Sequence, residues 1–287
     1  MKTDNTFALT EFVSEAPYGK PVGAIHRGFE ILELFAVQQV PLTVGEVSEK
    51  LGYPQSSTSV LLHGLANLGY LLHDRRARTF FPTVRVTFLG MWLQHRILNH
   101  GSVLQFMETL ANKSGHVVLL AMQNGLYAQY THIVSSRSSR VGLKPGLLRP
   151  ICRAAVGKVL LSTKGDDEIK RIVRNVNAIE AAKAPPISVD ELLGEIQECR
   201  RTGFAFSCDS VTAGSAVVAT LIPVEIAGAA VAIGVGVHSN EFETLRPVMM
   251  ELLQHTVADY FSDANHVNAS DATGPTIQPP YSVLNKS

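Results

Sequence analysis

Two groups of side chains in this chain are suited to hydrogen bonding and charge pairing with a polyanion. The first group is Gln55, Ser56, Ser57, Thr58 and Ser59. Gln pairs bidentately with adenine, and Ser or Thr bonds a base edge or a phosphate. His63, one helical turn further on, is expected to reach a phosphate. The other interpretation of a Ser/Thr cluster is helix capping alone.

The second group consists of three arginines, Arg75, Arg76 and Arg78. At a hairpin tip they suit contact with phosphates or a minor groove, whereas an isolated basic cluster is more often a solvated face. Residues 20–100 carry eight Lys or Arg against five Asp or Glu, while residues 101–263 carry fifteen against sixteen. Because this basic excess is local and small, one module should bind nucleic acid weakly and two together usefully.

The elements that must position these groups form a winged helix-turn-helix. Apolar residues at helical spacing predict a helix from about Ile25 that ends before Pro41. A second helix is predicted to begin after a capping box of Thr43 and Glu46 and to end at Gly52-Tyr53-Pro54. A third helix is predicted over Gln55–Leu68, and a hairpin of Tyr70–His73 and Thr79–Phe81 makes the wing. The third helix is expected to turn Val60, Leu61, Leu65 and Leu68 inward.

The rest of the chain predicts an amphipathic helix and then an α+β domain. The helix, Thr83–His100, is apolar around much of its girth and should pack against another element or another chain. Beyond it, the predicted helices are 103–113, 153–161, 166–173, 189–203 and 241–262, and the predicted strands are 117–123 and 126–134. The long apolar stretch Ala216–Val237 contains Pro223 and Glu225, so it predicts two buried strands joined by a turn at 225–228 rather than a membrane span.

Composition limits the class of protein. The chain has 287 residues, 46% hydrophobic, and a net charge of zero, which excludes dominant disorder and indiscriminate binding to polyanions. Three cysteines without a CxxC pair, and an N-terminus without the layout of a signal peptide, favour a reducing, cytoplasmic setting and no membrane partner. Residues 1–21 and 263–287 are expected to be flexible tails.

The common catalytic, phosphate-binding and metal-binding motifs are absent, so neither an enzyme, a cofactor nor a metal is expected. The alternative is a small-molecule enzyme with a helical appendage that uses Cys208 or Asp209, although no His is evident beside them. A third interpretation is a sensor or dimerisation module that has lost the ability to bind DNA.

Several motifs in this order resemble the IclR family of bacterial transcription regulators. They are 24–35, 41–44, 51–58 and 65–71 in the first half, and Gly146 with Pro150, 155–161, 203–205 and 222–224 in the second. The resemblance covers about residues 22–262. It implies a winged helix-turn-helix DNA-binding domain (22–82), a linker helix (83–100) and a GAF-like α/β effector-binding domain (101–262). It also implies homodimers, or dimers of dimers, on double-stranded operator DNA.

The resemblance further implies a pocket for a small organic effector, with backbone NH groups holding a carboxylate. Carried over by position, its residues are Gly146, Leu147, Ala154, Ala155, Val156, Ser207, Cys208, Asp209, Val217, Gly234 and Gly236. Here the chain departs from family members for small oxo-acids, because Val217, Gly234 and Gly236 replace polar side chains. Glycines should leave volume, so we expect a larger, less polar effector, such as an aromatic acid or a derivative. Arg149 and Arg153 are candidate cationic anchors, although an isolated Arg is more often exposed.

Overall fold

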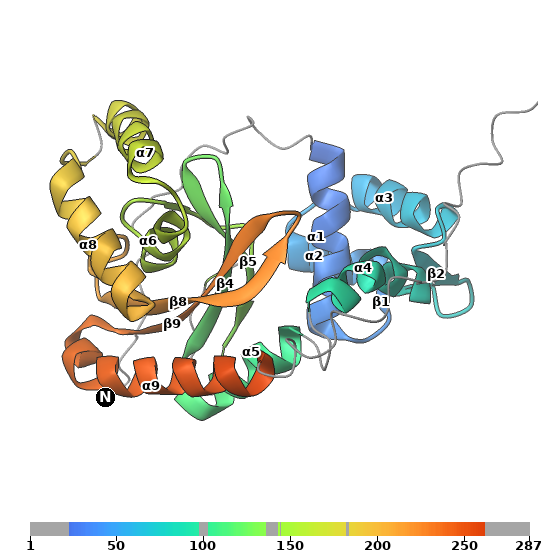
Figure 1. The fold of residues 1–287 in the computed structure, drawn as a ribbon. Helices are drawn as coiled ribbons and strands as arrows, with labels where there is room; N and C mark the ends of the chain where they lie inside the picture. The colour runs from blue at the N-terminus through green and yellow to red at the C-terminus, as the bar shows by residue number, and fades with distance from the viewer. Residues whose placement is uncertain (1–22, 98–102, 136–142, 144, 182–183, 262–287) are drawn as a thin grey trace, which may run out of the picture.

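The computed structural model describes residues 23–97, 103–135, 143, 145–181 and 184–261, without the side chains of 91–97 (Figure 1). The two expected tails, and the last residues of the expected linker helix, lie outside the described residues. The described chain contains an N-terminal helical domain with a small sheet, and a larger domain with a six-stranded sheet.

The N-terminal domain is three helices and a small antiparallel sheet. The helices are α1 (Gly23–Gln38), α2 (Val44–Leu51) and α3 (Gln55–Asn67), and the strands are β1 (Leu42–Thr43), β2 (Leu71–Asp74) and β3 (Thr79–Pro82), in the order β1-β3-β2. The capping box of Thr43 and Glu46 is present at the start of α2. Strand β1, which the sequence did not predict, is only two residues long and pairs with β3.

The inward face of α3 differs from the expected one. Val60 is 72% exposed and Leu68 60% exposed, whereas Thr58 and Leu62 are fully buried. Thr58 and Leu62 are four residues apart and so lie on one face, which packs on α1, while Val60 and Leu68 lie on the other side. The core of this domain is made of Ile31, Phe35, Leu42, Val47, Leu62, Leu71 and Phe80.

Helix α4 (Val84–Ile97) follows the wing and leads to the second domain. Its described part exposes large apolar side chains, with Val84 71%, Phe88 59% and Leu89 53% exposed. Helix α1 also exposes three, Ile25, Phe29 and Val37. Within this chain, α4 contacts β8 of the second domain, which leaves most of this apolar surface uncovered.

The second domain is an antiparallel sheet between two layers of helices (Figure 1). The strands are β4 (Val117–Asn124), β5 (Tyr127–Val134), β6 (Leu148–Pro150), β7 (Phe204–Cys208), β8 (Ser215–Ile226) and β9 (Ala229–His238), in the order β6-β5-β4-β9-β8-β7. Helices α5 (Val103–Ser114) and α9 (Phe242–Phe261) cover one face. A short 3-10 helix (Ser239–Glu241) joins β9 to α9. Helix α6 (Ala155–Ser162) covers the other, with α7 (Asp166–Glu180) and α8 (Val189–Thr202) outside it. Strands β6 and β7 were not predicted, and α7 runs beyond its expected end.

The apolar stretch Ala216–Val237 forms two buried strands, as expected, but the turn between them is tighter. Ile226 pairs with Ala229, so only Ala227 and Gly228 form the loop, with φ values of 52° and 76°. Two consecutive left-handed residues suit a two-residue hairpin. No helix of the described residues is long and apolar enough to cross a membrane.

Candidate DNA-binding surface and effector site

The turn between α2 and α3 is anchored to α1. Gly52 ends α2 with a φ of 70°, a left-handed conformation that Gly adopts without strain. The Ser48 hydroxyl donates to the Tyr53 carbonyl at 2.5 Å, and the Tyr53 hydroxyl donates to Glu30. The Arg27 guanidinium lies 4.8 Å from the centre of the Tyr53 ring. These contacts fix the direction in which α3 leaves the turn.

The polar cluster at the start of α3 divides into exposed and inward side chains. Gln55 and Ser56 are exposed and suited to contact a partner. Ser57 and Thr58 both donate to the Pro54 carbonyl at 3.0 Å, and Thr58 is fully buried. The expectation that Thr58 faces DNA is therefore wrong for this packing. Pro54 precedes the helix and no side chain caps it, which does not support capping as the purpose of the cluster.

The His63 side chain packs against the wing strands, a contact that the sequence did not predict. Its Nδ1 lies 2.8 Å from the Ser59 carbonyl. Its ring meets His73 and Phe80 edge to face, with centroid distances of 5.1 and 5.2 Å. His63 therefore joins α3 to the wing strands, and a phosphate contact by its Nε2 stays a prediction.

The wing tip presents the three arginines. The Asp74 carboxylate accepts from the backbone NH groups of Arg76 at 2.8 Å and Ala77 at 3.1 Å, which shapes the turn. Arg75, Arg76 and Arg78 are all exposed, and none forms an ion pair with another described residue. Their charges are therefore available to a partner.

The predicted effector residues on the sheet share the face that α6 covers, except one. Pairing aligns Ser207 with Val217, and Val217 with Gly236, in one row across β7, β8 and β9. Successive residues of a strand face opposite sides, so Cys208 faces away from this row. Glu243, at the start of α9, helps to raise the pKa of Cys208. Because α9 covers the face of the sheet opposite α6, this agrees with Cys208 facing α9. Cys208 does not belong to this wall.

Gly234 and Gly236 leave no free volume, contrary to expectation. A Cβ on Gly234 would lie 2.9 Å from Val217 Cγ1 and 3.2 Å from Val156 Cγ1. A Cβ on Gly236 would lie 2.8 Å from Val117 Cγ1. Neighbouring valine methyl groups fill the space, so the glycines are needed for close packing and give no argument for a larger ligand.

Asp209 supports a turn. Its φ is 53°, and its carboxylate accepts from the Gly214 NH at 2.6 Å. Desolvation and the adjacent Asp209 carboxylate raise the pKa of the Cys208 thiol, which keeps it protonated at neutral pH. Nothing in this geometry activates Cys208 as a nucleophile.

The remaining predicted effector residues surround the start of α6. Gly146 has a φ of 87°, and its NH donates to the Tyr130 carbonyl at 2.7 Å. The Tyr130 NH in turn donates to the Leu147 carbonyl. Ala154, Ala155 and Val156 are buried against the sheet, and no side chain caps α6. A Cβ on Gly157 would lie 2.0 Å from the Ile151 carbonyl oxygen. The turn that contains Ile151 therefore packs directly on α6.

The two candidate anchors differ in their surroundings. The Arg153 guanidinium pairs with Glu180 at 2.9 Å and also donates to the Pro185 carbonyl. Arg149 is 5% exposed and lies over the Tyr130 ring. Arg153 is thus already paired with a carboxylate of α7, whereas Arg149 is buried on the side of the predicted effector residues.

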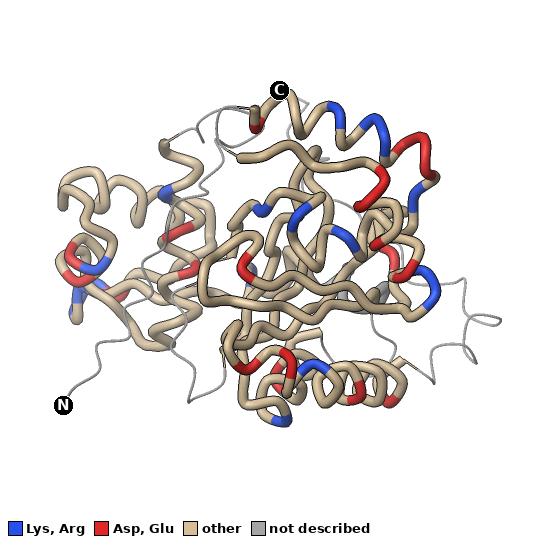
Figure 2. The backbone as a smooth tube through the Cα atoms, turned by 90° about the vertical axis from the view of Figure 1, so that its left-hand side faces the viewer, with Lys and Arg blue, Asp and Glu red and all other residues tan. Residues whose placement is uncertain are grey.

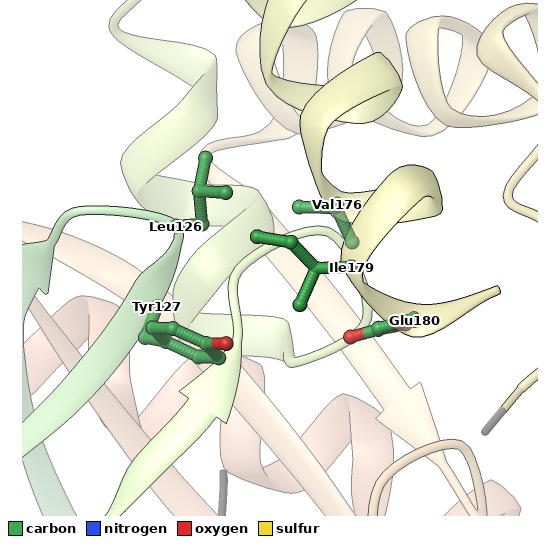
Figure 3. A pocket seen from close by; sticks show the side chains of 5 residues that line it. All are labelled: Leu126, Tyr127, Val176, Ile179 and Glu180. Atoms are coloured by element: carbon green, nitrogen blue, oxygen red, sulfur yellow. The ribbon is translucent and has the colours of Figure 1, made fainter. Parts of the chain in front are cut away.

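A shallow surface hollow lies outside the predicted site (Figure 3). It is lined by Leu126, Tyr127, Val176, Ile179 and Glu180, from the start of β5 and the end of α7. The only charged side chain in its lining, Glu180, is paired with Arg153. This hollow offers little to a polar ligand.

Charges of both signs interleave on the side of the molecule that Figure 2 faces. On α7 and α8, Arg200 pairs with Asp166 at 2.8 Å and Arg201 with Glu198 at 2.5 Å. No group of three or more His, Cys, Asp or Glu among the described residues could hold a metal ion. In contrast to these paired arginines, the three arginines of the wing form no ion pair with a described residue.

Comparisons with known proteins agree with this arrangement. The chain is similar to the HTH-type transcriptional regulator KdgR of Escherichia coli, 24% identical over 249 residues that cover 86% of this chain and 92% of the relative. It is also similar to the HTH-type transcriptional repressor AllR of Escherichia coli, 23% identical over 242 residues, 84% of this chain and 89% of the relative.

Among solved structures, the IclR of Thermotoga maritima matches with a TM-score of 0.57 at 18% identity, covering 83% of this chain and 97% of that one. The effector domain of an IclR transcriptional regulator from Acinetobacter sp. ADP1 matches with a TM-score of 0.52 at 26% identity, over 55% of this chain and 92% of that one.

The family models match both domains and so confirm the expected fold. The IclR helix-turn-helix domain matches residues 24–75, and the bacterial transcriptional regulator IclR C-terminal domain matches residues 95–260. The second match alone covers more than half of the chain. This protein belongs to the IclR family of bacterial transcriptional regulators, with an N-terminal helix-turn-helix and a C-terminal effector domain.

Proposed function

We propose that this regulator binds a near-palindromic operator through α3 and the wing, and that a small organic acid changes this binding. The observation that supports DNA binding is that Gln55 and Ser56 are exposed, as are the wing arginines, which form no ion pair with a described residue. Members of this family are DNA-binding regulators rather than enzymes, so the alternative interpretation as an enzyme is wrong. Operator binding also assigns the protein to the cytoplasm, where bacterial DNA lies.

The proposed functional boundaries are those of the sequence analysis: a DNA-binding domain over 22–82, a linker helix over 83–100 and an effector domain over 101–262. The proposed assembly is a homodimer, or a dimer of dimers. Its support is the exposed apolar surface of α1 and α4, with Phe29 61% and Phe88 59% exposed. Sedimentation of the wild type and of Phe88→Ser tests it, because a dimer held by this surface should dissociate more readily in the variant.

The proposed effector is an organic acid with an apolar body, such as an aromatic acid. Its site would comprise Gly146, Leu147, the start of α6 and the sheet row of Ser207 and Val217. Support for the apolar body is the composition of the wall, where Val156, Val217 and Ala219 are buried. The uncapped backbone NH groups at the start of α6 suit a carboxylate.

The proposed coupling runs through α4. Strand β8 carries Val217 in the effector wall and also contacts α4. A shift of β8 on effector binding would move α4 and so change the spacing of the two DNA-binding domains in a dimer. Coupling of this kind is typically about 1–3 kcal/mol.

Fluorescence anisotropy on the duplex from the gene's own upstream region tests the proposal. The expected result is salt-dependent binding that exceeds binding to a scrambled duplex, and that one class of acid shifts. Absence of specific binding with every acid of the panel would refute the operator proposal and favour a module that senses ligand without DNA.

A further inference from the structure

Arg149 on β6 holds a buried positive charge. The residue is 5% exposed, and its Cζ lies 5.8 Å from the centre of the Tyr130 ring. Burial raises the pKa of Tyr130, and a hydrogen bond from Arg149 opposes this rise, so the phenol is neutral and supplies no counter-charge. A guanidinium withdrawn from water is destabilising unless an opposite charge compensates it.

No carboxylate of the described residues compensates Arg149. The other partly or fully withdrawn cations of this region each have one: Arg153 pairs with Glu180, Lys158 with Glu195 at 2.7 Å, and Lys164 with Glu168 at 2.9 Å. All three acids come from α7 and α8, on the far side of α6 from the sheet. Arg149 is therefore the exception among its neighbours.

The sequence around Arg149 cannot supply the missing charge either. Between Glu108 and Asp166 the chain has no Asp or Glu, while it has eight Lys or Arg. This stretch includes β4, β5, β6 and α6. This stretch of sequence therefore has an excess of basic residues, and the acids that pair with Arg153, Lys158 and Lys164 come from α7 and α8.

Arg149 lies on the sheet face where the effector residues are. It pairs with Ala128 on β5, and Ala128 and Tyr130 belong to the apolar cluster that contains Ala154–Val156 and Val217. The backbone of Tyr130 accepts from the Gly146 NH and donates to the Leu147 carbonyl. Gly146 and Leu147 thus fix the strand that carries Arg149 beside the start of α6.

From these observations we infer that Arg149, oriented by Tyr130, is the charged anchor that binds the carboxylate of the effector. The inference rests on the proposed effector site and names the residue that selects acids over neutral analogues. The guanidinium fork matches the two oxygens of a carboxylate, and an amide in its place would leave the buried charge uncompensated.

The test compares acids with their amides on the full chain. The probes are benzoate, phenylacetate and pyruvate against benzamide, phenylacetamide and pyruvamide, read by thermal unfolding and then by calorimetric titration of the best acid. The expected result is that at least one acid, but not its amide, raises the unfolding midpoint of the wild type.

Two variants and a control isolate Arg149. Arg149→Gln should weaken binding of that acid at least about tenfold, as loss of a charged hydrogen bond predicts. Arg149→Lys keeps the charge without the fork and should weaken binding less, and this variant tests the inference if Arg149→Gln does not fold. Arg171→Gln, on the exposed surface of α7, should bind like the wild type.

Three results would overturn the inference: no response of the wild type to any acid, equal binding of acid and amide, or wild-type affinity in either Arg149 variant. Duplex binding by the same preparations without acid is measured in parallel. If the wild type selects the acid through Arg149 but binds no duplex, the operator proposal fails and the anchor stands. If the duplex is bound and no acid is, the anchor fails alone.

Discussion

His63 on α3 and His73 on β2 meet edge to face, with ring centroids 5.1 Å apart and an interplanar angle of 78°. His73 is in turn stacked on Phe80, at 4.4 Å and 5°. Through these rings the orientation of α3 is tied to that of the wing. A helix and a hairpin that must both reach one duplex benefit from such a fixed relation.

Replacing His63 with Ala should weaken operator binding by loosening this relation, and should lower the unfolding free energy by about 0.5–1.5 kcal/mol. The slope of log affinity against log salt should stay unchanged, because a positioning ring releases no counterion. His63→Phe keeps an aromatic ring and should recover most of the affinity. A flatter slope in His63→Ala would instead show a phosphate contact.

Arg75→Ala and Arg76→Ala should flatten the salt slope, by about 0.9 for each phosphate that the variant no longer neutralises. Both side chains are exposed at the wing tip and have no described acidic partner, so stability should not change. Anisotropy at several salt concentrations measures the slope, and Arg171→Ala on α7 is the matched control. An unchanged slope in the double variant would remove the wing from the interface.

Ser56→Ala and Thr58→Val should separate recognition from stability within one helical turn. Thr58 is fully buried and its hydroxyl donates to the Pro54 carbonyl, so Thr58→Val should cost about 1 kcal/mol of unfolding free energy. Ser56 is exposed, so its loss should lower operator affinity and leave the urea midpoint unchanged. The reverse pattern would mean that α3 presents another face to DNA.

The difference between Ser56 and Thr58 shows the limit of sequence reasoning here. Local signals such as the Thr43 capping box and the Gly52 turn predicted where the helices of the N-terminal domain begin and end, because they act between residues close in the chain. Which side of α3 faces inward depends on how it packs on α1, a contact that helical periodicity alone left ambiguous with Leu61, Leu62 and Leu65 all apolar.

The effector wall shows the same limit for strands. Predicting the two strands of 216–237 was possible from their β-branched residues, whereas strand β7 is short and its register was not readable. Register decides that Ser207 faces α6 and Cys208 does not, and cross-strand pairing decides that Val217 and Val117 fill the space beside Gly234 and Gly236. The missing counter-charge of Arg149 also required the fold, although the acid-free stretch around it was visible in the sequence.

Cys208 should react slowly with iodoacetamide despite its exposure. Desolvation, Asp209 and Glu243 raise the pKa of its thiol, so the reactive thiolate is scarce at neutral pH and its share grows only as the pH rises above the usual thiol value. Asp209→Asn removes a negative charge and should speed labelling at about pH 8, near the ordinary thiol pKa. Buried Cys152, whose pKa burial raises to about 12, should be labelled only after denaturation. Fast labelling of native Cys208 would contradict the protonated state.

Gly157→Ala should unfold the effector domain, whereas Gly194→Ala should stabilise it. A Cβ on Gly157 would lie 2.0 Å from the Ile151 carbonyl oxygen, a backbone atom that cannot move without shifting the turn before α6, so we expect a loss of about 3 kcal/mol or more. Gly194 is also helical, in α8, but has open space around it and should gain about 0.5–1 kcal/mol from the lower entropy of the unfolded chain. Urea unfolding measures both. Because the turn between Arg149 and α6 packs on Gly157, a tolerated Gly157→Ala would show that this turn moves, and with it the anchor that we assign to the effector.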